Sequence, residues 1–191
     1  MLASKSIFSF LDLILCKNPD YFKSAEEHRH YVELMRLALK LADRILAISE
    51  HARRDVIEYF KISGEKIDVV YLGLNTDQFY RVSDRAEIDA FRAEHHLPQK
   101  FILYVGTDYP HKNLKNLYIA FSKIMNLPSL SDYYLVTAGI NYYRRGTEYL
   151  QADLDRIRDR VISLGHFDDE KLHLLYNAAG IFVFPSLYEG F

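Results

Sequence analysis

Uninterrupted apolar runs alternate with amphipathic segments along the chain, most clearly after residue 100. Four runs have the length and composition of buried strands: FILYVG from Phe101, YYLVTAG from Tyr133, VISLG from Val161 and IFVF from Ile181. Helices are predicted in the segments between them, at 114–125, 147–160 and 168–179. Strands that alternate with helices form parallel sheets through right-handed crossovers. We therefore predict an α/β fold with a doubly wound sheet of at least four parallel strands, covered by helices on both faces.

The first hundred residues show the same alternation in a less complete form. Apolar runs predict strands at 6–15, 45–49 and 66–75. Helices are predicted after Ser24, where Glu27 completes a capping box, after Ser49, and over 84–97. Residues 76–83 have no period and predict a connector. We therefore divide the chain into three parts: the tail of a first Rossmann-like domain at 1–75, a connector with a linking helix at 76–99, and a nearly complete second Rossmann-like domain at 100–191.

Composition narrows the class of protein. The chain has 24 basic and 26 acidic residues, so it lacks the basic excess that is typical of nucleic-acid binding. A single cysteine, Cys16, excludes an intrachain disulfide and suits a reducing compartment. No run of about 18 apolar residues occurs, so no spanning helix is predicted, and Asp12 argues against a secretory signal. Neither a zinc motif nor paired cysteines are present, and we predict no metal ion or other cofactor.

The carboxyl ends of the later strands carry the candidate chemistry. Open parallel sheets bind ligands at this edge. Gly106 ends the first of these strands, and Lys112 precedes a helix that should begin near Asn113, which is a suitable arrangement for a diphosphate. The alternative is that Gly106 only ends a strand and Lys112 is solvated, and the turn taken alone favours this alternative. The glycine fingerprint of nicotinamide-dependent oxidoreductases is absent, which argues against that class.

Glu189 follows the last predicted strand in the stretch GIFVFPSLYEGF. A lone glutamate after a strand is usually solvated. Its place at the same predicted edge as Lys112 favours a binding role, and the amides of Gly190 and Phe191 could then donate to phosphate or hydroxyl oxygens.

Three longer stretches resemble the retaining GT-B glycosyltransferases of family 4. They are, in the family's order, LADRILAISEHARRDVIEYFKISGEKIDVVYLGLNTDQF, FILYVGTDYPHKNLKNLYIAF and LGHFDDEKLHLLYNAAGIFVFPSLYEGF. The resemblance is to the mannosyltransferase-like branch, group 1, that builds bacterial surface polysaccharides. It implies a GT-B-like fold in which two Rossmann-like domains face a cleft and the second one holds a nucleotide-sugar.

The resemblance also implies roles for individual residues. Lys112 would contact the donor diphosphate, together with Gly106 and Thr107. Many members carry arginine at the position of Thr107, and His111 could partly replace that charge. Glu189, with Gly190 and Phe191 beside it, would contact the hydroxyls of the transferred sugar, so Glu189 and Lys112 are the predicted catalytic residues. Gly165, His166 and Phe167 would lie along the nucleobase. Leu11 stands where the family has a histidine that contacts the donor sugar.

The implied activity is transfer of a mannose-like hexose from a nucleotide-diphosphate sugar to a glycan or lipid-linked acceptor, with retention of configuration. The resemblance implies a cytoplasmic protein, either free or peripherally associated with the inner face of the membrane. It also implies a chain shortened at both ends, because most of the acceptor domain and a second glutamate are not present in the sequence. We therefore expect little transferase activity from these residues alone, and a non-catalytic nucleotide-sugar-binding module is the alternative.

Overall fold

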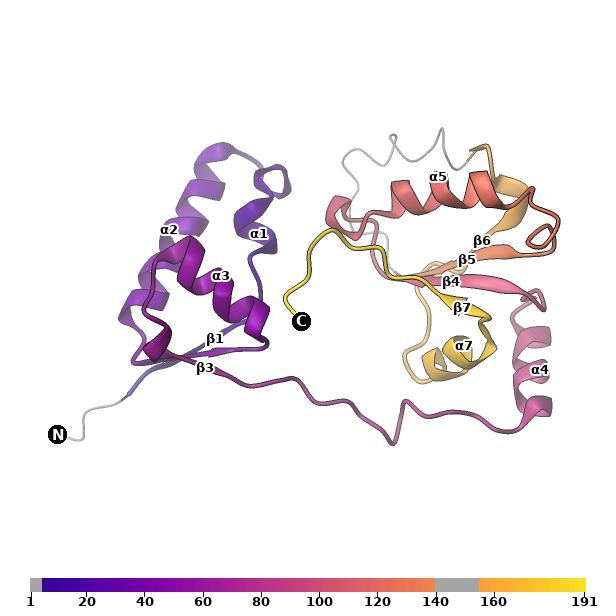
Figure 1. Ribbon diagram of the computed structural model, residues 1–191, viewed down its shortest axis with the longest axis horizontal. Helices are drawn as coiled ribbons and strands as arrows, with labels where there is room; N and C mark the ends of the chain where they lie inside the picture. Colours follow the sequence, from indigo (N-terminus) through magenta and orange to yellow (C-terminus); the bar gives the residue numbers. More distant parts are fainter. Residues whose placement is uncertain (1–4, 140–154) are drawn as a thin grey trace. The chain divides into compact units, whose positions relative to one another are not determined.

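A computed structural model of the protein describes residues 5–139 and 155–191. The chain divides into two compact units, the first comprising Met1–Gly73 and Tyr188–Phe191 and the second comprising Leu74–Leu187. Each unit is built around its own parallel sheet (Figure 1). The last four residues fold with the beginning of the chain, whereas the predicted division placed all of 100–191 in one domain.

The first unit is a three-stranded parallel sheet with its helices on one face (Figure 1). Its strands lie in the order β1-β2-β3, with the bounds Ile7–Phe10, Arg44–Ala47 and Ile67–Val69. The helices are α1 (Ile14–Lys17), α2 (Ala25–Leu41) and α3 (Glu50–Phe60), and 3-10 turns lie at Pro19–Tyr21 and Gly64–Lys66. Successive side chains of a strand point to opposite faces. Phe10 is accordingly buried in the core, which includes residues of all three helices, while Ile7 is exposed.

Helices α2 and α3 begin where the sequence predicts. The Oγ of Ser24 accepts a hydrogen bond from the N–H of Glu27 at 3.1 Å, and the Oγ of Ser49 accepts one from Ala52 at 3.0 Å. The carboxylate of Glu27 reaches the N–H of Lys23 at 2.9 Å, one residue before the position that a capping box uses.

Two strands of the first unit are shorter than predicted. The predicted strand 6–15 ends at Phe10, because the Asp12 carboxylate accepts a hydrogen bond from the N–H of Ile14 at 2.7 Å and starts helix α1. The predicted strand 66–75 ends at Val69. Its neighbour β2 stops at Ala47, whose carbonyl accepts the last bond, from Val70 at 2.9 Å, so the following residues have no strand to pair with.

The second unit contains a four-stranded parallel sheet in the order β6-β5-β4-β7. The bounds are β4 Phe101–Val105, β5 Tyr134–Ala138, β6 Val161–Ser163 and β7 Ile181–Phe182. All three pairings are parallel, which confirms the predicted sheet.

Helices cover both faces of this sheet (Figure 1). Helix α5 (Leu114–Ile124) lies on one face, and α4 (Arg85–Glu94) and α7 (Leu172–Ala178) lie on the other. Alternate residues of β4 enter two separate clusters, so that Ile102 and Tyr104 pack with α5, while Phe101 and Leu103 pack with α4 and α7. Burial on both faces explains why β4 is a continuous apolar run in the sequence.

Other predicted elements have mixed outcomes. Most of the predicted helix 147–160 lies outside the described residues, and its end, Arg158–Arg160, is a 3-10 turn. The helix predicted over 168–179 begins only at Leu172, because the Asp168 carboxylate accepts a hydrogen bond from the N–H of Glu170 at 2.9 Å and forms a turn instead.

The predicted connector, residues 76–83, is bound to α7. The side-chain amide of Asn177 donates to the carbonyl of Tyr80 at 2.9 Å and accepts from the N–H of Val82 at 3.0 Å.

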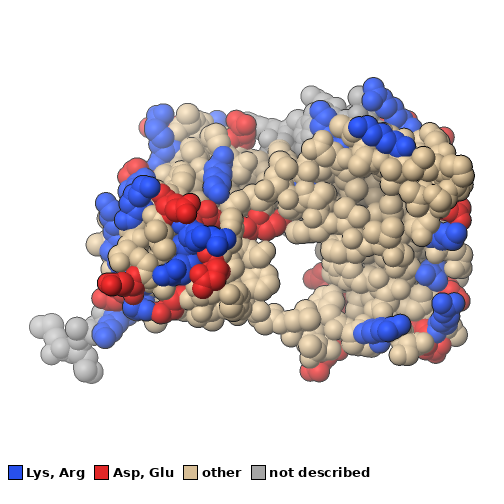
Figure 2. Space-filling view, viewed as in Figure 1, with Lys and Arg blue, Asp and Glu red and all other residues tan. Residues whose placement is uncertain are grey.

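Charges of both signs are mixed over the first unit on the face that Figure 2 shows, and no large patch of one sign gathers there among the described residues. Within the same ranges of the chain, no helix is both long enough and apolar enough to cross a membrane.

Candidate functional site

Backbone groups line the carboxyl ends of three neighbouring strands in the second unit. The N–H of Gly106, after β4, donates to the carbonyl of Ala138 at 2.8 Å, and the N–H of Gly139, after β5, donates to Gly165 at 2.7 Å. A Cβ on Gly139 would lie under 3.0 Å from the backbone of Gly106, and the φ of Gly139 is +141°. Glycine is therefore required at position 139 for steric reasons, because its backbone packs directly against that of Gly106.

The loop after Gly106 leads directly into the amino end of α5. The hydroxyl of Tyr104, which is buried in the sheet, donates to the carbonyl of Thr107 at 2.7 Å and fixes the start of the loop. A 3-10 turn, Pro110–Lys112, follows, and Asn113 then takes a left-handed conformation with φ +63°. Asparagine tolerates this conformation well. The predicted start of the helix near Asn113 is confirmed, with α5 beginning at Leu114.

Residues 183–187, which follow β7, form hydrogen bonds with the same loop. The side-chain amide of Asn113 donates to the carbonyl of Pro185 at 3.0 Å, and the N–H of Leu187 donates to the carbonyl of His111 at 2.8 Å. The ammonium of Lys112 lies 5.0 Å from the ring centroid of Phe184. The structure thus brings together two of the predicted strand ends, and Lys112 lies at their junction.

His111 and Phe167 both pack against other rings of the second unit. His111 is buried at 7% exposure, and its ring stacks on Tyr109 with the centroids 5.8 Å apart. The ring of Phe167 packs against Phe91 and His95, at centroid distances of 6.2 and 5.3 Å. The neighbouring His166 is exposed. The roles assigned to these residues at the diphosphate and the nucleobase stay predictions.

Glu189, Gly190 and Phe191 belong to the first unit, whereas Lys112 belongs to the second. Gly190 is buried against the end of β1, where a Cβ would lie under 3.0 Å from the carbonyl oxygen of Leu11. The structure therefore brings together Leu11 and Gly190, which the resemblance assigns to the same sugar. The ring of Phe191 contacts that of Tyr71 edge to face, with the centroids 6.3 Å apart.

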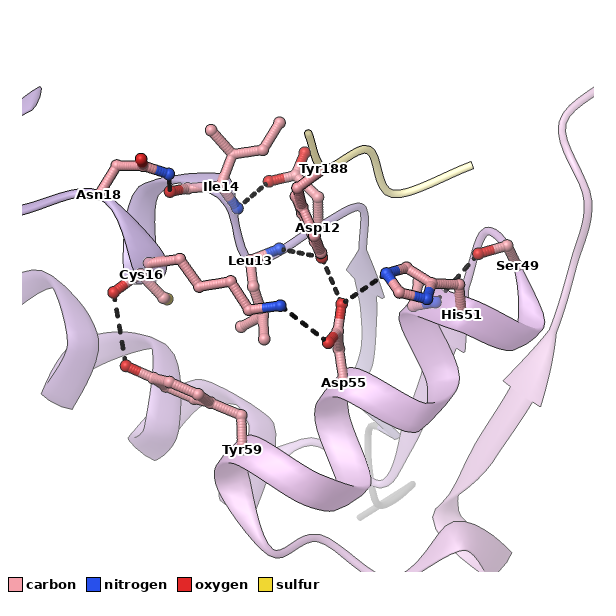
Figure 3. Close-up of polar contacts among 12 residues, drawn as sticks. Asp12, Leu13, Ile14, Cys16, Asn18, Ser49, His51, Asp55, Tyr59 and Tyr188 are labelled. Carbon is pink, nitrogen blue, oxygen red and sulfur yellow. Dashed lines mark hydrogen bonds and ion pairs between the residues drawn. The ribbon is translucent and has the colours of Figure 1, made fainter. Parts of the chain in front are cut away.

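Sequence reasoning missed Tyr188 and Asp55. The Tyr188 hydroxyl donates a hydrogen bond to the Asp55 carboxylate and accepts one from the N–H of Leu13 at 3.0 Å (Figure 3). The ammonium of Lys17 lies 3.4 Å from the same carboxylate. These contacts are the physical reason that the last four residues join the first unit.

Metal ligands do not gather in the described ranges 5–139 and 155–191, where no three His, Cys, Asp or Glu side chains form a group that could hold an ion.

Comparison with known proteins identifies the family. Residues 86–191 match the family described as glycosyl transferases group 1. The chain belongs to this family. Residues 10–78 of this group 1 glycosyl transferase also match a second description, glycosyltransferase family 4. The family resemblance predicted from the three stretches is confirmed.

Curated relatives of this group 1 glycosyl transferase include two bacterial enzymes. The O-antigen chain mannosyltransferase B of Escherichia coli is 27% identical over 188 residues, which is 98% of this chain and 48% of that protein. The O-antigen chain mannosyltransferase RfbU of Salmonella typhimurium is 24% identical and is matched over 91% of this chain and 44% of its own length. The chain thus spans about half the length of these two relatives.

Solved structures show the same fold. Sucrose-phosphate synthase from Thermosynechococcus elongatus superposes with a TM-score of 0.75 at 24% identity, covering 97% of this chain and 45% of that one. HepE of Anabaena in complex with UDP and glucose gives a TM-score of 0.73 at 21% identity, covering 97% and 47%. The predicted GT-B-like α/β fold is confirmed.

Proposed function

We propose that this chain is part of a hexosyltransferase that transfers a mannose-like sugar from a nucleotide-diphosphate donor to a glycan or lipid-linked acceptor in surface polysaccharide synthesis. Family membership and the two mannosyltransferases described above support the proposal. Retention of configuration and a cytoplasmic location, with or without peripheral membrane association, are parts of the same proposal.

The observation that carries the proposal is the geometry of the loop at 106–113. Gly106 is partly exposed where β4 ends, and the left-handed Asn113 turns the chain into the amino end of α5. The first N–H groups of a helix have no partner within the helix and attract anions, and Lys112 adds a full positive charge next to the start of α5. These groups would bind the diphosphate and stabilise the negative charge that develops on it as the sugar leaves. This chemistry needs no metal ion. Glu189 would contact the hydroxyls of the hexose, and we assign no catalytic base.

A binding module without turnover is the second candidate. Leu11 favours it, because an exposed leucine beside Gly190 cannot form the hydrogen bond that a histidine would supply. A hexose-transfer assay run beside a binding titration separates the two candidates, since both predict binding of the donor and only the first predicts transfer.

Substitution of Lys112 tests the proposed diphosphate site. A charge-assisted contact in a partly desolvated site contributes about 1.5–3 kcal/mol, so Lys112→Ala should weaken binding of GDP or UDP by about ten- to a hundredfold, measured by calorimetry. Lys100→Ala is the control. Lys100 lies at the opposite end of β4, where its ammonium pairs with Asp132 at 2.6 Å and is exposed. We expect its loss to change affinity by less than about twofold, because distant exposed charges are screened. Equal effects at matched ionic strength would indicate nonspecific electrostatics and contradict the proposal.

A further inference from the structure

The hydroxyl of Tyr188 forms two hydrogen bonds, one as donor and one as acceptor. It donates to the Asp55 carboxylate and accepts from the N–H of Leu13 at 3.0 Å, as the dashed lines in Figure 3 trace. The ring is also held, with the ammonium of Lys17 4.0 Å from its centroid and the ring of His51 5.3 Å away. A phenol whose donor and acceptor are both engaged has a single favourable orientation, so these contacts fix the position of Tyr188.

Asp55 is the centre of this cluster. It is 9% exposed, and Tyr188, Lys17 and His51 all approach its carboxylate, Lys17 at 3.4 Å and His51 at 3.6 Å. A buried carboxylate is tolerated when donors and an opposite charge compensate it, as they do here. Burial and the Asp55 carboxylate raise the pKa of Tyr188, so the phenol stays protonated and able to donate.

Gly190, on the other side of Glu189, is also fixed in position. The Oγ of Ser49 donates to the carbonyl of Gly190, and Gly190 lies so close to the carbonyl of Leu11 that it has no room for a Cβ. Glu189 therefore stands between two anchored residues, Tyr188 and Gly190. Its backbone position depends on contacts that its neighbours make with helix α3 and the end of β1.

We propose that Tyr188 and Asp55 are positioning residues that set Glu189 for the hexose of the donor. The inference rests on the proposed function, because it takes Glu189 to be the group that contacts this sugar. Neither Tyr188 nor Asp55 touches the hexose itself, and both act through the backbone of the chain at 188–190. A purely structural role would lower the stability of the first unit without changing how the protein distinguishes a nucleotide-sugar from its nucleoside diphosphate.

The test compares affinities for GDP-mannose and GDP, and for UDP-glucose and UDP, by calorimetry on the whole chain. Tyr188→Phe removes one oxygen atom and keeps the ring. We expect it to weaken binding of the nucleotide-sugar by about fivefold while leaving binding of the nucleoside diphosphate within about twofold. Glu189→Gln should shift the same ratio in the same direction. Tyr59→Phe is the matched control. Tyr59 lies on α3, as Asp55 does, and its hydroxyl donates to the carbonyl of Cys16 at 3.4 Å and not to the chain at 188–190.

The outcomes separate this proposal from the proposed function. Diphosphate binding with an unchanged sugar ratio in Tyr188→Phe would overturn the positioning role and leave the proposed function standing. Absence of any nucleotide binding to the unsubstituted chain would overturn both. Asp55→Asn keeps an acceptor for the phenol and removes the charge, so it provides a second variant if Tyr188→Phe does not fold. We expect it to shift the ratio in the same direction, and an unchanged ratio in this folded variant would overturn the proposal.

Discussion

Cys16 lies in helix α1, in the core of the first unit, at 4% exposure. Burial, and secondarily the nearby charge of Asp12, raise the pKa of its thiol from 9.0 to about 11. The thiolate is the reactive form of cysteine, so this environment suppresses both its formation and its access to reagents. The residue acts as a small apolar side chain within the core.

Alkylation should measure this directly. We expect iodoacetamide at pH 8 to modify Cys16 at least about 100-fold more slowly in the folded chain than in urea. The thiol of Cys16 keeps its proton to a higher pH in the folded chain than in the unfolded chain, because its pKa is raised from 9.0 to about 11. The free energy of unfolding should therefore fall as the pH rises from 9.0 towards about 11. A reaction equally fast in native and denatured samples would contradict this account of the core.

Single residues differ in how far the sequence could predict them. The helix start near Asn113 was predicted correctly because a strand, a turn and a helix start are adjacent in sequence. The role of Lys112 beside it stays a prediction. The pairing of Tyr188 with Asp55 was not predicted, because the two residues lie 133 positions apart and no motif marks either of them. Pairing across that distance depends on the tertiary fold.

Two glycines at the strand ends of the second unit differ in what surrounds them. Gly139 and Gly165 both have positive φ, at +141° and +64°. A Cβ on Gly139 would collide with the backbone of Gly106, whereas a Cβ on Gly165 would meet nothing within 4 Å. Steric overlap therefore adds to backbone strain at one position only.

Alanine substitutions separate these two costs. We expect Gly165→Ala to lower the free energy of unfolding by about 1 kcal/mol, from the left-handed backbone alone. Gly139→Ala should cost about 3 kcal/mol, because β4 and β5 must also move apart. Urea unfolding of the two variants measures the difference, and equal losses would show that the contact between these strand ends is not tight.

At the scale of elements, the sequence predicted the second unit better than the first. The central strands β4 and β5 are buried on both faces and are therefore continuous apolar runs. The edge strands β6 and β7 were found from the same pattern, although β6 is only partly buried and both residues of β7 are exposed. The errors fall where partners or turns decide the boundary. Strand β3 ends early because β2 offers it no further partner, and α7 begins late because Asp168 forms a turn.

The two units have separate cores. Ile45 lies in the core of the first unit and Leu103 in that of the second, and both are completely buried. The sequence indicated two α/β regions from the connector near residue 76, but hydrophobic patterning carries no sign that residues 188–191 return to the first region. That return depends on hydrogen bonds to Tyr188 and Gly190.

Amide hydrogen exchange followed by NMR should resolve the two units. Ile45→Ala and Leu103→Ala each remove a fully buried side chain from a central strand, at an expected cost of about 2–5 kcal/mol. We expect the first substitution to speed exchange in residues 5–73 and the second in residues 74–139 and 155–187. The amides of Glu189 to Phe191 should respond to Ile45→Ala. A response of these amides to Leu103→Ala alone would contradict the division.

The hydrogen bond from Leu13 to Tyr188 joins positions 175 residues apart. During synthesis, the strands and helices of the first unit are made before Leu74–Leu187, and Tyr188 is made after them. Closing an unstructured loop of that length costs about 5 kcal/mol of chain entropy. A second unit that has already folded orders most of the intervening chain before the closure occurs. The connectivity therefore favours an order of assembly in which the contacts of Tyr188 with the first unit form after Leu74–Leu187 have folded.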